Sequence, residues 1–180
     1  MRMKTTLLTA LMLVSVAVAQ AAEPLQSRVL LDGKVTMLVP NGLALMSDAD
    51  KRERYPGRNA PAYVLTNDDW SVNIAFDHKQ LSMKPTEVGE LEGPMRQQLA
   101  GAKINASGVR KINGADFLVI DADVNMADDA KLHNLIAVTS LEGRMLVISY
   151  NCLLNFDAAC GAIGPQLVGS IVLKPQAIAK

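Results

Sequence analysis

The sequence predicts an α+β domain in which an antiparallel β-sheet carries helices on its faces. Several segments alternate between apolar and polar residues, as half-buried strands do. Two short segments, 117–120 and 145–148, are apolar at every position, which is typical of strands covered on both faces. Two longer segments repeat apolar residues at steps of three and four, which favours helices.

Residues 1–21 are set aside because they have the pattern of a cleaved secretory signal peptide. Arg2 and Lys4 supply a positive start, and the apolar run Leu7–Val18 is shorter than the roughly 20 residues that a membrane span needs. Small residues at 19 and 21 suit a signal peptidase, and no cysteine nearby could carry a lipid. We therefore expect a soluble periplasmic protein with no membrane anchor, in which residues 22–180 form a single domain.

The charge balance and the cysteines narrow the function classes. Eighteen basic residues balance eighteen acidic ones without a basic run, so nucleic acid is not an expected partner. In an exported protein, Cys152 and Cys160 are expected to form a disulfide. Redox catalysis by this pair is disfavoured because it usually has the tighter C-x-x-C spacing. A structural zinc site is disfavoured because it needs four ligands.

The first half of the chain contains three predicted strands. Lys34–Val39 alternates cleanly and ends at a Pro-Asn-Gly turn. Ala62–Thr66 and Trp70–Asp77 are separated by a polar turn and predict a hairpin. In the second of these strands, alternation places Trp70 on the core-facing side, together with Val72, Ile74 and Phe76.

A helix is predicted over residues 85–100, with Thr86 as its N-cap and a kink near Pro94. One face of this helix is apolar, formed by Val88, Leu91, Met95 and Leu99. A second helix is predicted over Ala162–Leu173, with Pro165 in its first turn.

Four more strands are predicted between the two helices. Ser107–Ile112 and Ala115–Val124 flank Asn-Gly, a strong hairpin signal. Lys131–Thr139 and Arg144–Tyr150 form the next pair. Two residues of the fully apolar segments, Ile120 and Val147, are expected to be completely buried.

Several phrases of the sequence resemble the DcrB-like family of bacterial periplasmic proteins. They are Tyr55–Pro61, Val72–Asp77, Lys111–Gly114 and Leu141–Cys152, and the similarity extends over essentially the whole mature chain. The resemblance implies the Mog/PsbP-like fold, an α/β/α sandwich. Known roles of this fold are binding or accessory ones, in nuclear transport, in photosystems and in secretion. Some DcrB-like proteins are lipoproteins, and this chain differs from them in lacking a lipobox cysteine.

One short motif has the spacing of calcium ligands. Asp121, Asp123 and Asn125 match the start of a calcium loop, but Met126 stands where the loop needs glycine and Leu132 where it needs glutamate. A solvated strand end is the favoured interpretation, and no metal site is predicted.

The sequence contains no recognisable catalytic set. His78 and His133 are its only histidines, neither has a ligand-like partner nearby in the sequence, and both are expected at the surface. There is no G-x-S-x-G elbow and no glycine-rich phosphate loop. We therefore expect no cofactor and no enzyme activity.

The irregular segment Arg52–Pro61 is the candidate binding site. It contains Tyr55, Arg58 and Asn59 between prolines and a glycine, and tyrosine and arginine are enriched at recognition sites. Alternatively, the loop only packs over a sheet edge. The function expected from the sequence is a non-catalytic periplasmic binding or accessory protein that recognises a protein or envelope component. The alternative is a hydrolase or other enzyme with a site that the sequence does not reveal.

Overall fold

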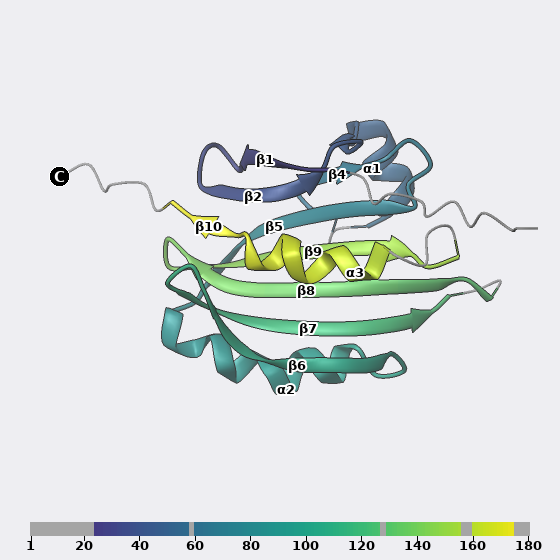
Figure 1. The fold of residues 1–180 in the computed structure, drawn as a ribbon. Helices are drawn as coiled ribbons and strands as arrows, with labels where there is room; N and C mark the ends of the chain where they lie inside the picture. Colours follow the sequence, from purple (N-terminus) through teal and green to yellow (C-terminus); the bar gives the residue numbers. More distant parts are fainter. Residues whose placement is uncertain (1–23, 58–59, 127–128, 156–159, 175–180) are drawn as a thin grey trace, which may run out of the picture.

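The structure, a computed structural model, describes residues 24–57, 60–126, 129–155 and 160–174. It contains two antiparallel sheets, a seven-stranded one in the order β3-β4-β5-β9-β8-β7-β6 and a three-stranded one in the order β1-β2-β10 (Figure 1). The α+β fold class is confirmed. The expectation of one sheet is wrong. The small sheet was not predicted because β1 lacks clean alternation and β10 is very short.

Each predicted strand has a counterpart in the structure. The seven-stranded sheet consists of β3 (Ala44–Leu45), β4 (Tyr63–Thr66), β5 (Val72–Ser82), β6 (Lys103–Ile112), β7 (Ala115–Asn125), β8 (Lys131–Leu141) and β9 (Arg144–Leu153). The small sheet consists of β1 (Leu25–Leu30), β2 (Val35–Pro40) and β10 (Val172–Leu173). The hairpin predicted from Asn113-Gly114 is confirmed, and both turn residues have the positive φ that such a turn requires (45° and 91°).

The helices differ more from the prediction. They are α1 (Asp48–Arg54), the 3₁₀ helix η1 (Pro85–Leu91), α2 (Glu92–Gln98) and α3 (Cys160–Gly169). None of these helices, among the residues that the structure describes, is long and apolar enough to cross a membrane.

The helix predicted over residues 85–100 is divided between η1 and α2. The N-cap is Lys84 and not Thr86, because the backbone N–H of Lys84 donates to the Glu87 carboxylate (2.8 Å). The change from 3₁₀ to α geometry at Glu92 leaves Pro94 in the first turn of α2, where its missing N–H costs little. The predicted apolar face is confirmed and packs on the sheet.

The last helix begins and ends earlier than predicted. It starts at Cys160 and ends at Gly169, so that Pro165 lies inside the helix and not in its first turn. The chain then continues into β10, which pairs with β2. Helix α1 was missed because six of its seven residues are charged and it has no apolar face.

One face of the large sheet carries a continuous core that α3 and β2 cover (Figure 1). The helix approaches closely at Gly164, where an added Cβ would lie 3.0 Å from Leu135 and 3.3 Å from Tyr150. A disulfide joins Cys152 of β9 to Cys160, the first residue of α3, in agreement with the expected pairing. The bond therefore ties this helix to the sheet.

The opposite face carries two smaller clusters. One lies under η1 and α2 and contains Leu118 and Ile120, both fully buried. The other contains Met46, Val64 and Ala75. Ile120 is buried as predicted, whereas Val147 is only half-buried, because it lies at the margin of its cluster.

Trp70 does not share the side of Ile74 and Phe76. It precedes the strand with a φ of 60°, outside the extended geometry that strand alternation assumes. The half-buried side chain packs against the cluster of Val64 and Ala75 on the opposite face. The predicted orientation of Trp70 is therefore wrong.

Candidate functional site

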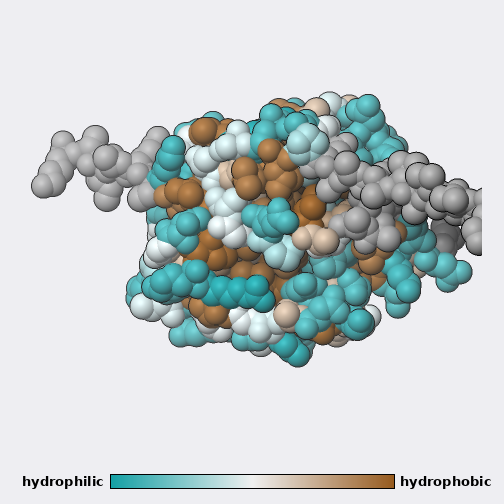
Figure 2. Space-filling model, in the orientation of Figure 1, coloured by the Kyte–Doolittle hydropathy of each residue, from teal (hydrophilic) through white to brown (hydrophobic). Residues whose placement is uncertain are grey.

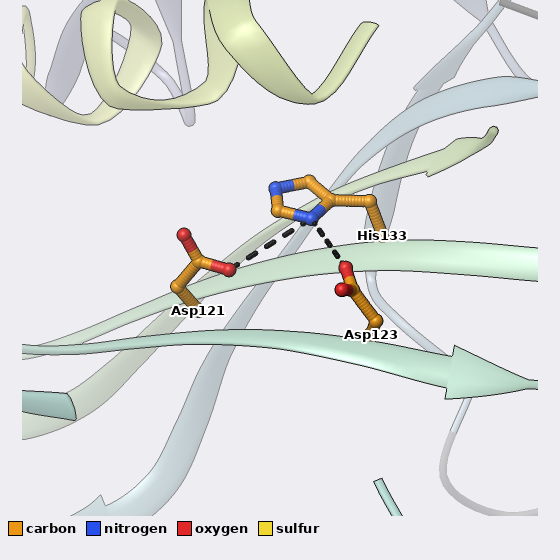
Figure 3. A group of neighbouring side chains, drawn as sticks. All are labelled: Asp121, Asp123 and His133. Carbon is orange, nitrogen blue, oxygen red and sulfur yellow. Dashed lines mark hydrogen bonds and ion pairs between the residues drawn. The ribbon is translucent and has the colours of Figure 1, made fainter. Parts of the chain in front are cut away.

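Strands β7 and β8 bring three ionisable side chains together on the face that α3 covers. Asp121 and Asp123 are two residues apart in β7 and so point to the same side. Asp123 and His133 are register partners across the β7–β8 pair. Figure 3 shows both carboxylates beside the Nδ1 atom of His133, with α3 above the ring. The calcium-like spacing thus lies along a strand, and its two aspartates meet a histidine that the sequence analysis had treated separately.

The contacts within the Asp121–Asp123–His133 cluster are short. Nδ1–H of His133 donates to Oδ1 of Asp123 at 3.0 Å, and Oδ1 of Asp121 lies 3.8 Å from the same nitrogen. Asp121 also accepts a hydrogen bond from the Nδ2 amide of Asn105 in β6 (3.0 Å). About a quarter of each aspartate side chain is exposed (25% and 28%), so the cluster is open to solvent on the carboxylate side.

His133 is buried, which corrects the expected surface position. Only 7% of the residue is exposed, and Nε2 has no hydrogen-bond partner among the described residues. The reason is α3, since an added Cβ at Gly161 would lie 3.4 Å from the imidazole ring. The covering helix comes much later in the chain, so the strand pattern around His133 could not reveal it. His78 is half-buried, and its Nε2 lies 3.0 Å from the carbonyl oxygen of Leu141.

The neighbours of Asp123 favour the ionised form of its carboxyl group. The hydrogen bond from His133 lowers the pKa of the Asp123 carboxyl below its usual value; partial burial opposes this shift, while Asn105 and Lys103 add to it. Asp123 therefore stays ionised at neutral pH. Two carboxylates and one imidazole in this arrangement can bind a cation or hold a proton, depending on what reaches them.

A hollow of about 160 Å³ adjoins the cluster between α3 and strands β6–β8, and Asp121 forms part of its wall. Gly108 in β6, the register partner of Val119, contributes no side chain to fill the space. Figure 2 shows hydrophobic side chains exposed between α3 and the neighbouring strands, with hydrophilic ones beside them. The hollow is lined by Arg110, Lys111, Ile112, Val119, Asp121, Leu135, Pro165, Val168 and Gly169.

The predicted loop site lies elsewhere. Tyr55 follows α1, is half-buried and packs against Met46, Val64 and Ala75, on the sheet face opposite His133. Burial raises the pKa of its phenol, and the charge of Arg54 opposes this. Arg58 and Asn59 lie outside the described residues, as do residues 1–21. The structure therefore does not bring Tyr55 to the cluster or to the hollow.

Comparisons with known proteins identify the fold. No protein-family model and no curated protein sequence matches the chain. The solution structure of cyanobacterial PsbP (CyanoP) from Synechocystis sp. PCC 6803 superimposes with a TM-score of 0.58 at 15% identity, over 90% of this chain and 99% of that one. LpqN of Mycobacterium tuberculosis, described as involved in cell envelope biogenesis, gives a TM-score of 0.46 at 11% identity, over 86% and 88% of the two chains.

The comparison with CyanoP shows that this chain has a PsbP-like fold. The broader part of the resemblance drawn from the sequence is thus confirmed. Because many functions share one fold, the particular activity has to be argued from the sites.

Proposed function

We propose that the chain is an exported, DcrB-like accessory protein of the bacterial periplasm that binds a protein partner and catalyses no reaction. The signal-peptide pattern of residues 1–21 supports export. The disulfide between Cys152 and Cys160 supports an oxidising compartment. The PsbP-like fold is compatible with a binding role.

The arrangement of potential nucleophiles supports binding over catalysis. Both cysteines are in the disulfide, so neither is a free thiolate. Within the described ranges, neither histidine has a hydrogen bond to a serine or threonine hydroxyl, which nucleophilic catalysis by those residues would use.

The hollow beside α3 is the observation that carries the proposal. Its volume of about 160 Å³ is close to that of a cavity of roughly 150 Å³ that accepts benzene, so it suits one apolar side chain. Such a pocket is the usual place for an interface hot spot.

The charges at the hollow indicate what should accompany that side chain. Arg110 has no ion pair among the described residues, whereas Lys111 already lies 3.4 Å from Asp116. The guanidinium of Arg110 is therefore available for a carboxylate. We propose that the partner presents an apolar side chain next to an acidic one.

Photocrosslinking in the periplasm tests this proposal. A photoreactive amino acid at position 110 should give one adduct of discrete mass. The same probe at position 109 should give no adduct. Val109 is exposed, but its side chain lies beside Gly89 of η1, on the other side of β6. Arg110→Glu should reduce the yield of an adduct formed from position 169, an exposed residue of α3 that also lines the hollow and where an added Cβ meets nothing within 4 Å. No adduct, or equal adducts from positions 109 and 110, would reject the hollow as the binding site.

The loop with Tyr55, Arg58 and Asn59 remains a proposed second recognition surface. A probe at position 60, which is exposed, tests it in the same experiment. Because Tyr55 lies on the other face of the sheet, a partner bound at this loop should give an adduct that Arg110→Glu does not affect.

A further inference from the structure

We propose that Asp121, Asp123 and His133 form a binding site for a divalent transition-metal ion, of which zinc is the best probe. The three potential ligand atoms, one from each residue, lie within 4.8 Å of one another (Figure 3). The proposal goes beyond the binding of a partner at the hollow and does not depend on it.

The spacing of the donor atoms suits a shared ion. Two ligands of a tetrahedral zinc ion, each about 2.0–2.1 Å from the metal, are about 3.3 Å apart. Nδ1 of His133 lies 3.0 Å from Oδ1 of Asp123 and 3.8 Å from Oδ1 of Asp121. Small rotations of two partly exposed carboxylates would bring all three atoms to one ion.

The burial of the histidine supports a fixed ligand. The side chain of His133 is only 9% exposed, so packing sets the orientation of the ring. The polar contacts of the ring go from Nδ1 to the two carboxylates, whereas Nε2 points away from them and has no partner in the described part of the chain. Gly161 holds the ring from the α3 side, since a Cβ there would lie in contact with it. The imidazole is thus fixed with Nδ1 facing the acidic groups.

The surrounding charges favour a cation. Asp121 and Asp123 are adjacent on one face, and neither has a lysine or arginine nitrogen within 4.0 Å among the described residues. Asn105 donates to one oxygen of Asp121, an outer contact of the kind that orients a ligand carboxylate. Lys103 is the register partner of Asp123 across β6 and is the nearby positive charge with which the ion would compete.

The donor types select the kind of ion. Calcium and magnesium prefer oxygen ligands alone, and copper(I) prefers sulfur, whereas zinc and manganese accept imidazole together with carboxylates. Three protein ligands on an open side leave a coordination position for water, as in zinc sites that are not purely structural.

Calorimetry with untagged, disulfide-intact protein measures the predicted binding. Zinc should bind with one ion per chain and micromolar or tighter affinity, and calcium should not compete. Asp121→Asn and Asp123→Asn preserve side-chain shape and should each weaken zinc binding by more than about ten-fold. Asp116→Asn in the same strand, whose carboxylate pairs with Lys111, should bind zinc like the unmodified protein.

NMR of the histidine rings identifies the ligand without a histidine variant that could fail to fold. The chain has only two histidines, so His78 is an internal control. Zinc should shift the ring signals of His133 and leave those of His78 unchanged. Absence of zinc binding, equal binding by the variant with both Asp121→Asn and Asp123→Asn, or shifts confined to His78 would reject the site. Asp123 is not among the lining residues of the hollow. Asp123→Asn should therefore still give the adduct from position 110 while it weakens zinc binding, so that the metal site and the partner site are tested separately.

Discussion

The two faces of the seven-stranded sheet are covered in different ways. On the α3 face, one continuous core extends from β2 across the sheet, and the helix is held close to it by glycine contacts and by a disulfide. On the other face, the apolar residues form two separate clusters, one under η1 and α2 and one beside α1. The ionisable cluster and the hollow both belong to the face with the larger core.

A row of asparagines crosses three strands on the second face. Asn73, Asn151 and Asn134 are successive register partners across β5, β9 and β8, and Asn151 donates a hydrogen bond to Asn73 (2.9 Å). The contrast shows that apolar burial on the second face is limited to two separate clusters. On the α3 face, a continuous core can hold the buried imidazole of His133 in one position. The predictions below test that difference.

Removal of the disulfide should have the largest effect. Replacing both Cys152 and Cys160 by alanine removes the tie between β9 and α3 and should lower the free energy of unfolding by about 2–5 kcal/mol. Urea unfolding measures the loss. Treatment with a reductant should lower the stability of the unmodified protein and leave that of the variant unchanged. A variant as stable as the unmodified protein would show that packing alone holds α3.

The smaller cluster under η1 should still be tightly packed. Ile120 is fully buried there, so Ile120→Ala should cost about 2–4 kcal/mol from lost burial and a cavity. Val147 is half-buried at the margin of the same cluster, and Val147→Ala should cost about 1 kcal/mol. Equal losses measured by urea unfolding would mean that the cluster has no tightly packed centre.

Alanine substitutions at two glycines test how closely the helices approach the two faces of the sheet. Gly164→Ala in α3 should destabilise by about 1–3 kcal/mol, because the new Cβ would be 3.0 Å from Leu135. Gly93→Ala in α2 meets nothing within 4 Å and should stabilise by about 0.4–1 kcal/mol through helix propensity and reduced freedom of the unfolded chain. Thermal unfolding of both variants gives the signs. A neutral or stabilising Gly164→Ala would contradict the close approach of α3, and a destabilising Gly93→Ala would contradict the open space beside α2.

The strands were largely predictable from the sequence because their signals are local. The alternation in 34–39 and the Asn113-Gly114 turn determine a strand and a hairpin without reference to distant residues. Helix α1 also had a local signal that apolar periodicity does not measure. Ser47 caps it by accepting from the N–H of Asp50, with acidic residues in the first turn and basic ones in the last.

The site was less predictable because it depends on long-range contacts. Asp123 and His133 are equally distant from residue 128, so a symmetric hairpin register would have paired them. The burial of His133 and the hollow require the position of α3, which no pattern in β7 or β8 encodes. Trp70 was misplaced for a related reason, since alternation assumes extended geometry and its φ is 60°.

The smallest expected effect concerns Tyr55, on the face opposite the ionisable cluster. Burial raises the pKa of its phenol, so the folded protein holds the neutral form more strongly than the unfolded chain does. This contribution to stability is complete below the ordinary tyrosine pKa of about 10, and it is lost as the pH rises through the higher pKa of the folded state. Tyr55→Phe removes the ionisable group but keeps the ring. The stability of the unmodified protein should therefore fall relative to Tyr55→Phe above about pH 10, with a constant difference at lower pH. Urea unfolding from neutral to alkaline pH measures the two curves. If they stay parallel throughout, the phenol is solvated, and the loop that follows α1 is free for recognition instead of being packed against Met46 and Val64.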